Sequence, residues 1–307
     1  MNKELGAKVP ATTANVGSGF DTLGIALSLY NEIYFKPEDS LSLVQSEFYV
    51  EGEGKTEICS GKSNMILQAM KAVSEKIGKD IPGGKFRLNN RIPLARGLGS
   101  SSSALVAGAF LANEYFGDIL SKKEILNITA GLEGHPDNVA PAVLGGFCIS
   151  SQKNDKVIVN KVKADPTWKS VVVVPDFELL TEKARSVLPD TYERQAVVNN
   201  IRSLSFLLSA FFSQNPEFLR LGLEDSVHVP YRLSLIPGGA EAIQNAYEAG
   251  AYGATISGSG PTMIAFTDEK NITSVGESMV SAFLKQNIPA RYMVLEFDLN
   301  GVSPIVC

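Results

Sequence analysis

Hydrophobic and polar residues alternate along several short stretches of the chain, and this pattern predicts β-strands. Successive side chains of a strand point to opposite faces, so alternation places one apolar face against a core. The same stretches are rich in β-branched and aromatic residues. The predicted strands are Tyr30–Phe35, Leu41–Val44, Lys85–Asn89, Gly146–Ser150, Val157–Val162, Ser170–Val174, Gly253–Ser257, Met263–Thr267 and Arg291–Phe297.

Other stretches repeat apolar residues every three or four positions, which predicts helices. One helix begins after Ser63 and ends at Gly78. A second begins at Ser121, where Glu124 completes a capping box, and continues through Ala130.

The longest predicted helix covers Asp190–Gln214. We expect its apolar stripe to pack against a sheet rather than against a partner helix. The stripe consists of Val197, Ile201, Leu204, Leu208 and Phe211.

The order of these elements favours an α+β fold, because strands and helices do not alternate regularly as in a doubly wound sheet. The polar stretch Ser151–Thr167 separates two groups of elements. We therefore predict an N-terminal domain at residues 1–160 and a C-terminal domain at residues 161–307, with the boundary defined to within about ten residues.

Composition narrows the class of protein. The 307 residues carry a net charge of −5, which argues against a general nucleic-acid binder. Three dispersed cysteines form no disulfide framework, and two histidines are too few for a histidine-rich metal site. The N-terminus has no apolar signal segment, and no apolar run approaches the roughly 18 residues of a membrane span. A cytoplasmic protein is expected.

Glycine is slightly enriched, and three clusters combine it with serine or threonine. The middle cluster, Pro93–Gly108, reads PLARGLGSSSSALVAG; it follows a predicted strand and leads into an apolar helix. Its glycines allow close approach of the backbone to a ligand, and the N–H groups at a helix start favour an anion. We prefer a triphosphate site, with a serine hydroxyl available to Mg²⁺, to a merely capped helix.

Neither standard nucleotide motif is present. Gly61-Lys62-Ser63 has the ending of a Walker A loop, but Thr56 stands where that loop requires glycine. The paired glycines of the first and middle clusters also lack the third glycine of a dinucleotide fingerprint.

The two outer clusters are ambiguous when each is taken alone. The first, Pro10–Gly24, contains Asn15 and Asp21, an amide and a carboxylate that could bind a polar ligand. The third, Ser257–Thr262, lies between two predicted strands. Simple glycine turns and ligand contacts are equally good explanations of both clusters.

Together, in this order and spacing, the clusters resemble the three signature motifs of the GHMP kinases. The resemblance covers essentially the whole chain. It implies an N-terminal domain with a left-handed βαβ unit and a ferredoxin-like C-terminal domain. It also implies ATP and Mg²⁺ as cofactors.

Four segments resemble the branch of this family that phosphorylates L-homoserine on its way to threonine. They are PATTANVGSGFDTLG in the first motif, Glu133–Pro141, Thr181–Pro189 and Asp225–Gly238. Two departures occur: Ser18 stands where many relatives have proline, and Ser102-Ser103 replaces the commoner Ala-Ala. The second departure leaves open which serine meets the metal, although the alignment indicates Ser101.

The resemblance implies a role for each of these residues. Arg185 and Arg232 bind the substrate carboxylate, which suits the planar guanidinium group. Asp21 and Asn15 receive the ammonium group, and Glu133 and Ser101 are Mg²⁺ ligands. Further substrate contacts are His135, Thr181 and Gly258; the ATP contacts are Asn64 at the adenine, with Arg96, Gly97, Leu98, Gly99, Ser100, Ser101, Ser102 and Ser103.

The catalytic residues implied in the same way are Asn138, His135 and Glu133. Some members of the family use an aspartate as base, and Asn138 takes that place here. An amide cannot accept the proton, so we expect Asn138 to orient the hydroxyl, with His135 and Asp137 as rival bases. His228 is interpreted as structural. The resemblance further suggests a homodimer. Two alternatives to this function remain: a kinase of the same family that acts on another substrate, and a catalytically silent regulator that binds ATP.

Overall fold

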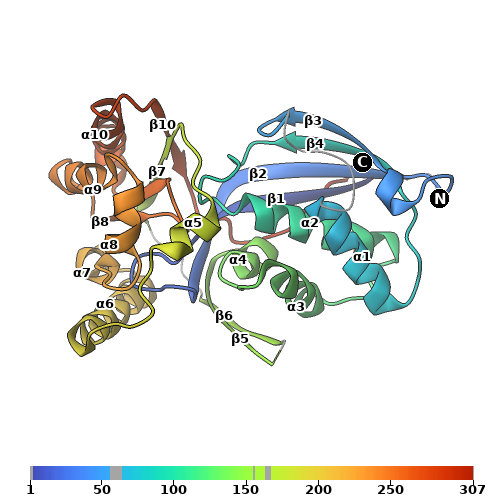
Figure 1. Ribbon diagram of the computed structural model, residues 1–307, viewed down its shortest axis with the longest axis horizontal. Helices are drawn as coiled ribbons and strands as arrows, with labels where there is room; N and C mark the ends of the chain where they lie inside the picture. Colours follow the sequence, from blue (N-terminus) through green and yellow to red (C-terminus); the bar gives the residue numbers. More distant parts are fainter. Residues whose placement is uncertain (1–2, 56–63, 155, 163–166, 307) are drawn as a thin grey trace.

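Two β-sheets, each covered by helices, form the framework of the molecule (Figure 1). The structure is a computed structural model and describes residues 3–55, 64–154, 156–162 and 167–306. In the first sheet the strand order is β11-β1-β2-β4-β3, and β5 pairs with β2 and β6. Its strands are β1 (Leu5–Ala14), β2 (Leu23–Pro37), β3 (Glu47–Gly52), β4 (Gly84–Asn90), β5 (Phe147–Lys153), β6 (Lys156–Val162) and β11 (Ser303–Pro304).

Four helices lie on one side of this sheet, with α1 packed on α2: α1 (Met65–Ile77), α2 (Ser100–Tyr115), α3 (Lys122–Glu133) and α4 (Val139–Leu144). β3 and β4 are parallel and are joined through α1, which forms the expected βαβ unit. Its left hand stays a prediction.

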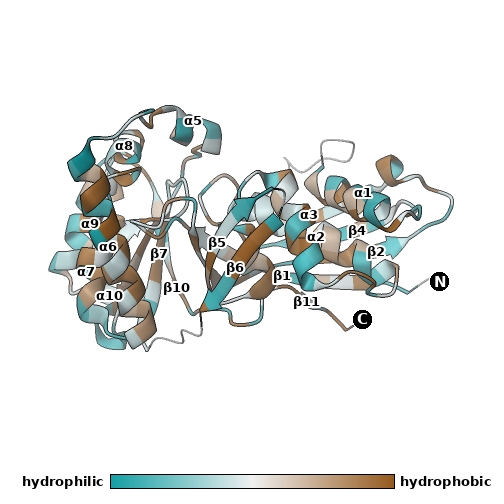
Figure 2. Cartoon of the chain, turned by 90° about the horizontal axis from the view of Figure 1, so that it is seen from below, coloured by the Kyte–Doolittle hydropathy of each residue, from teal (hydrophilic) through white to brown (hydrophobic). Residues whose placement is uncertain are grey.

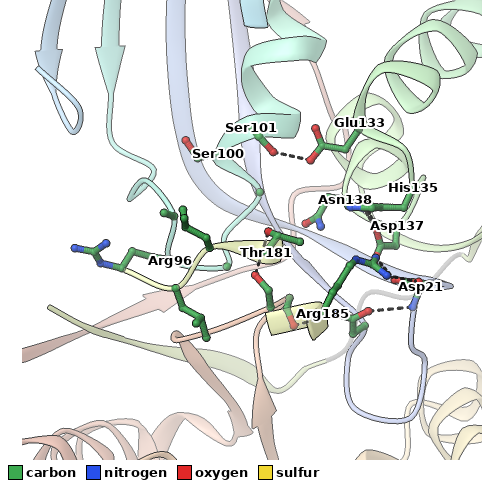
Figure 3. Close-up of a pocket in the computed structure, with 18 of the residues that line it drawn as sticks. Asp21, Arg96, Ser100, Ser101, Glu133, His135, Asp137, Asn138, Thr181 and Arg185 are labelled. Atoms are coloured by element: carbon green, nitrogen blue, oxygen red, sulfur yellow. Dashed lines mark hydrogen bonds and ion pairs between the residues drawn. The ribbon is translucent and has the colours of Figure 1, made fainter. Parts of the chain in front are cut away.

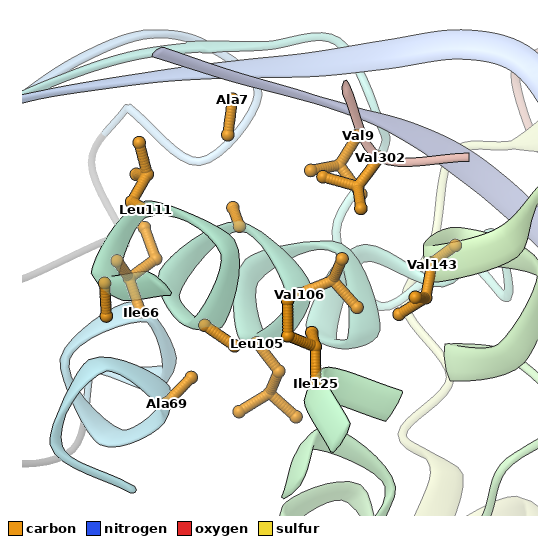
Figure 4. Packing of buried hydrophobic residues seen from close by; sticks show 14 of the residues in the cluster. Ala7, Val9, Ile66, Ala69, Leu105, Val106, Leu111, Ile125, Val143 and Val302 are labelled. Carbon is orange, nitrogen blue, oxygen red and sulfur yellow. The ribbon is translucent and has the colours of Figure 1, made fainter. Parts of the chain in front are cut away.

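Helix α2 is the centre of the N-terminal core (Figure 4). Leu105, Val106 and Leu111 pack among residues from β1, α1 and α3. A Cβ atom on Gly108 would lie 2.2 Å from the carbonyl oxygen of Ile66, so α1 and α2 approach closely there. Because α2 is buried on nearly all sides, the position of its N-terminus is fixed by the core.

The second sheet has the strand order β10-β7-β9-β8, and all its neighbouring strands are antiparallel. In chain order this is the 4-1-3-2 arrangement of a ferredoxin-like fold, so the predicted C-terminal fold is confirmed. The strands are β7 (Lys169–Pro175), β8 (Gly253–Ile256), β9 (Met263–Thr267) and β10 (Ala290–Leu295). The helices are α5 (Thr181–Ser186), α6 (Arg194–Ser213), α7 (Leu219–Leu223), α8 (Val229–Arg232), α9 (Gly239–Glu248) and α10 (Ile272–Leu284).

Most predicted strands are confirmed, but Leu41–Val44 is wrong. Leu43–Gln45 forms a 3₁₀ turn, in which the Ser42 hydroxyl donates to Gln45 Oε1 at 2.6 Å. This local bond replaces strand pairing. Strand β1 was not predicted, because Pro10 interrupts its pattern; the structure accommodates Pro10 at a register shift opposite β2.

The predicted helices are found, but two of them begin at other residues than predicted. Helix α1 has Asn64 as its N-cap, while Ser63 lies outside the described residues, and α6 begins at Arg194 rather than at Asp190. Gly78 ends α1 in the left-handed conformation, and Ser121 with Glu124 caps α3. Residues 56–63, which include Gly61-Lys62-Ser63, lie outside the described residues.

The interpretation of the apolar stripe on α6 is wrong for its first half. Val197 is 43% exposed and Ile201 is 60% exposed. The buried side of α6 is instead formed by Ser203, Leu207, Ala210 and Phe211. Taken together, these residues are centred about a quarter of a turn around the helix from the predicted stripe, with which they share Phe211.

By length and mean hydropathy, α6 is also the one helix in the described part of the chain that could cross a membrane. A single helix of this kind is weak evidence. The inner side of α6 packs into the core of the folded chain through Leu207 and Phe211.

The two sheets share a hydrophobic core where they meet. The ring of Phe147 on β5 stacks on Phe211 of α6 with centroids 4.3 Å apart. Figure 2 shows β5 and β6 between the helices at the two ends of the molecule.

The predicted domain boundary is crossed twice by the first sheet. Strand β6 continues to Val162, and β11 returns from the end of the chain to pair with β1, with Ala7 opposite Pro304. The end of β6 at Val162 lies within the ten residues allowed for the boundary, and residues 303–304 belong to the first sheet.

Candidate active site

The three glycine clusters meet at one end of the shared core. The Ser257 hydroxyl donates to the carbonyl oxygen of Gly97 at 2.7 Å, and Asn15 Nδ2 donates to the carbonyl oxygen of Gly258 at 2.9 Å. A Cβ atom on Gly97 would lie 2.3 Å from the carbonyl oxygen of Ser257. Glycine is therefore required for this contact between the middle and third clusters.

A cavity of about 320 Å³ opens beside these contacts, and Figure 3 shows its side chains. Three acidic and three arginine side chains line it, so its charges are nearly balanced. The lining residues are Asn15, Asp21, Met65, Ala95, Arg96, Gly97, Gly99, Ser100, Ser101, Glu133, His135, Asp137, Asn138, Leu179, Leu180, Thr181, Arg185, Arg232, Gly258 and Ser259.

The start of α2 faces this cavity. Gly99 precedes the helix in the left-handed conformation, and no side chain among the described residues caps it. The first N–H groups of a helix lack partners within the helix, and its dipole favours an anion there. The start of α2 is thus suited to a phosphate group.

The four serines at this helix start do not occupy equivalent positions. Ser100 and Ser101 line the cavity, whereas Ser102 and Ser103 are fully buried. Leu98 is also fully buried, and its carbonyl oxygen accepts from the Thr12 N–H. The side chains of Leu98, Ser102 and Ser103 therefore pack beneath the loop, and Ser100 and Ser101 are the serines whose side chains line the cavity.

Glu133, the last residue of α3, points toward these serines (Figure 3). Its Oε1 accepts from Ser101 Oγ at 2.5 Å and from Ser102 Oγ at 3.0 Å. No group of three or more His, Cys, Asp or Glu residues that could hold a metal occurs in the described ranges. One carboxylate with a hydroxyl suits Mg²⁺, which commonly binds through one or two carboxylates, phosphates and water.

Asn138 lies close to the start of α2 and is held in one orientation. Thr12, fully buried on β1, donates its hydroxyl to Asn138 Oδ1 at 2.7 Å. Asn138 Nδ2 has no partner among the residues that the structure describes, and Asn138 lines the cavity. The side chain therefore presents N–H donors to a ligand.

His135 is paired with Asp137 beside Asn138. Its Nδ1 lies 3.0 Å from Asp137 Oδ1, which also accepts from the Asn138 N–H. The hydrogen bond to Asp137 raises the pKa of His135 above its usual value, although partial burial opposes the shift. A raised pKa increases the fraction of the ring that is protonated at a given pH, and a protonated ring cannot accept a proton.

Asp21 and Arg185, predicted to bind opposite ends of the substrate, bind each other. Arg185 donates to the two Asp21 oxygens at 2.7 and 3.0 Å (Figure 3). This bidentate bond raises the pKa of Arg185. Asn15 Oδ1 accepts from the Asp21 N–H at 3.0 Å and fixes the loop that carries the carboxylate.

Arg232 is 1% exposed, yet its side chain lines the cavity. Its Nε donates to the carbonyl oxygen of Ala184 at 3.1 Å, and Nη1 donates to that of Gly258 at 3.1 Å. Burial lowers the pKa of Arg232 to about 10, so the guanidinium remains charged at neutral pH.

Thr181 and Arg96 lie at the edge of the cavity. Thr181 Oγ1 is 3.5 Å from Ser259 Oγ. Arg96 forms ion pairs with Asp176 and Glu178 at 3.5 and 3.3 Å.

Asn64 does not line the cavity. Its Oδ1 accepts from the N–H groups of Ile66 and Leu67 and caps α1. The neighbouring Met65 does line the cavity. The predicted contact of Asn64 with adenine stays a prediction.

Sequence reasoning did not single out Thr12, and it interpreted His228 as structural. Thr12 and Thr13 are adjacent threonines on β1, and nothing in the sequence distinguishes them. His228 Nδ1 lies 3.2 Å from Arg232 Nη1, a contact for which the i, i+4 spacing within a helical segment was the one available signal.

Comparison with known proteins agrees with the motifs. The family model of the GHMP kinases N terminal domain matches residues 64–146, and that of GHMP kinases C terminal matches residues 207–286. Homoserine kinase of Desulfitobacterium hafniense is 41% identical over 298 residues, which cover 97% of this chain and 99% of that protein. Homoserine kinase of Synechocystis is 39% identical, with 96% of both chains covered.

Solved structures show the same relation. The crystal structure of homoserine kinase from Cytophaga hutchinsonii has a TM-score of 0.90 and 27% identity, covering 99% of this chain and 98% of that one. Mevalonate kinase of L. major has a TM-score of 0.71 at 16% identity, covering 98% of this chain and 99% of that one, which shows likeness of fold alone.

Proposed function

The chain belongs to the GHMP kinase family, among its homoserine kinases, and from this premise we propose how its residues perform the reaction. It transfers the γ-phosphoryl group of ATP to the side-chain hydroxyl of L-homoserine and yields O-phospho-L-homoserine for threonine biosynthesis. The main support for the mechanism is that one cavity is lined both by the uncapped start of α2 and by positively and negatively charged side chains.

ATP binds with its phosphates at the start of α2. The N–H groups around Gly97–Ser101 receive the phosphate oxygens, and Arg96 adds a positive charge at the edge. Ser101 and Glu133 would hold Mg²⁺, which when bound neutralises charge on the phosphates.

Homoserine binds at the other end of the cavity. It is a zwitterion, and the ion pair of Asp21 and Arg185 offers one negative and one positive group to its two charged groups. We infer that the substrate replaces this pair: its ammonium group binds Asp21, and its carboxylate binds Arg185 and Arg232. Asp21 and Arg185 thus neutralise each other before the substrate arrives.

Phosphoryl transfer depends here on positioning. Asn138 donates from Nδ2 and orients the acceptor hydroxyl or the phosphoryl oxygens next to it. Phosphoryl transfer has a loose transition state, so alignment and charge neutralisation supply most of the rate. The hydroxyl proton leaves to phosphate or water, and no side chain of the protein acts as a strong base.

A coupled assay of ADP release tests the substrate. We expect Mg-ATP turnover with homoserine in preference to serine, threonine and mevalonate. A preference for mevalonate would point to another kinase of the family. Binding of ATP without turnover of any of these substrates would point to a regulator.

A change of substrate preference tests the placement of the zwitterion. Asp21→Asn removes the acceptor for the ammonium group but leaves Arg185 and Arg232. The ratio of kcat/KM for homoserine to that for 4-hydroxybutanoate, which lacks the ammonium group, should fall about 10-fold or more. Glu182→Gln, on the exposed side of α5, is the control and should leave the ratio unchanged. An unchanged ratio in Asp21→Asn would refute this placement.

A pH–rate profile tests the absence of a base. We expect Asn138→Ala to reduce turnover severely, with no loss of an ionisation in the profile. The base-free mechanism is wrong if Asn138→Ala spares turnover while His135→Ala abolishes it together with a pKa near about 6–7.

We also propose that the protein acts in the cytoplasm as a homodimer. The exposed apolar side chains of α6, Val197, Ile201 and Phe212, are a surface that association would cover. Sedimentation of the wild type and of Ile201→Glu tests this: a dimer that Ile201→Glu converts to monomer is expected, and a monomeric wild type contradicts it.

A further inference from the structure

The ring of His228 is completely buried between the first cluster and Arg232. Its Nε2 lies 2.8 Å from the carbonyl oxygen of Gly17, and its Nδ1 lies 3.2 Å from Arg232 Nη1. A carbonyl oxygen can only accept, and a guanidinium can only donate. The proton is therefore on Nε2, and Nδ1 accepts from Arg232.

This arrangement requires a neutral ring. Burial, aided by the charge of Arg232, lowers the pKa of His228, while Asp225 opposes the shift. Asp225 does not bond the ring: Oδ2 lies 3.9 Å from Nε2 and accepts instead from the N–H groups of residues 227–229. Phe20 stacks on the ring with centroids 5.1 Å apart.

The protein provides partners for some of the N–H groups of Arg232, and His228 is one of these partners. Nε donates to Ala184, and the two N–H groups of Nη1 are directed to Gly258 and His228. No partner for Nη2 occurs among the described residues. Three of the five N–H groups are thus held by the protein, and the two on Nη2 remain for a ligand in the cavity.

We propose that His228 is a positioning residue that holds Arg232 with Nη2 turned toward the substrate carboxylate. This inference rests on the proposed role of Arg232 and adds the group that fixes its orientation. His228 also bonds both Gly17 and Arg232, so it fixes the position of the loop that bears Asp21 relative to the arginine that binds the carboxylate.

Three substitutions separate the two bonds of the ring. His228→Asn places an amide oxygen near the position of Nδ1 and keeps the acceptor for Arg232. His228→Gln places an amide nitrogen near Nε2 and keeps the donor to Gly17. His228→Phe keeps the stacking on Phe20 but loses both bonds.

We expect His228→Phe and His228→Gln to raise the KM for homoserine about 10-fold or more, because the carboxylate-binding guanidinium loses its orientation. The KM for ATP and the kcat should remain within about twofold, and His228→Asn should restore most of the affinity for homoserine. Val229→Ala, next to His228 in the C-terminal core, is the control. It should lower stability without changing the KM for homoserine.

A substrate without a carboxylate provides the second measurement. For 3-aminopropan-1-ol, kcat/KM should be the same in the wild type and in His228→Phe, whereas that for homoserine should fall. Equal losses for both substrates, or a rise in the KM for ATP, would overturn the proposal and indicate a general structural role.

Arg232→Gln and Arg232→Lys distinguish failure of this proposal from failure of the proposed function. If both leave the KM for homoserine unchanged, Arg232 does not bind the carboxylate, and both proposals fall. If they raise it while His228→Phe does not, the role of Arg232 stands and positioning by His228 is refuted.

Discussion

Thr12 and Asn138 lie 126 positions apart in the chain, and their side chains meet beneath the cavity. The Thr12 hydroxyl donates to the Asn138 oxygen, which leaves the amide nitrogen free to face the cavity. In a mechanism without a base, this orientation matters more than any proton affinity of the side chain.

Thr12→Val removes the hydroxyl and nearly preserves shape. We expect kcat to fall about 10-fold, because the Asn138 amide is no longer held in one orientation. Both KM values should change less than about twofold, and Thr12→Ser should recover most of the activity. Steady-state kinetics provide the measurement. Thr267→Val, which removes another buried hydroxyl in the second sheet, is the control. A normal kcat in Thr12→Val contradicts the role.

His135 gives stability a specific pH dependence. Its pKa in the folded protein is raised by Asp137 above the unfolded value of about 6.5. The pair therefore stabilises the fold fully below about pH 6.5 and loses this contribution as pH rises through the folded pKa. Relative to His135→Gln, the wild type should have a larger advantage in free energy of unfolding at pH 5.5 than at pH 8.5. Urea denaturation at both pH values measures it; an advantage that grows with pH would contradict the pairing.

Residue patterns predicted part of this site and could not predict the rest. Glu133, Arg185 and Arg232, which line the cavity, were predicted because they lie in recognisable segments of the chain. The bonds from Thr12 to Asn138 and from His228 to Gly17 join distant segments, so no local pattern contains them. The pairing of Asp21 with Arg185 also depends on the position of α5 beside the first cluster, which is distant in sequence.

At the scale of elements, sequence signals predicted the structure best where the bonds join residues that are close in sequence. The capping box at Ser121 and the left-handed Gly78 depend on neighbouring residues alone, and both helix ends were predicted. The direction in which α6 faces depends on packing with another part of the chain, and the apolar stripe predicted it correctly only in the second half of the helix. Strand β1 was missed because Pro10 interrupts its sequence pattern, whereas a register shift opposite β2 accommodates this proline in the structure.

Gly97→Ala tests the contact between two elements of the site. Gly97 has a φ of +78°, and an added Cβ would press on the carbonyl oxygen of Ser257. We expect the KM for ATP to rise about 10-fold or more, because the middle cluster must move away from the third. Gly78→Ala is a matched control, with a φ of +74° and no neighbour within 4 Å. It should cost about 1 kcal/mol of stability and leave the KM for ATP unchanged. Equal kinetic effects in the two variants would refute the contact.

At the scale of the whole molecule, a net charge of −5 is compatible with ATP binding because the positive groups are local. N–H groups at the start of α2 and three arginines face one cavity. Three acidic side chains balance those arginines, so the cavity suits a zwitterion beside an anion.

Residues near the end of the chain belong to the first sheet. Strand β11 pairs with β1, which leads into the first cluster, and Val302 before it is 2% exposed in the N-terminal core (Figure 4). Val302→Ala should lower the free energy of unfolding by about 1–3 kcal/mol, through lost burial and the cavity that remains. Val306→Ala, at a side chain 96% exposed, should change it by less than about 0.5 kcal/mol. Urea denaturation of both variants decides the matter. Equal stabilities would mean that the chain end is not part of the cooperative fold.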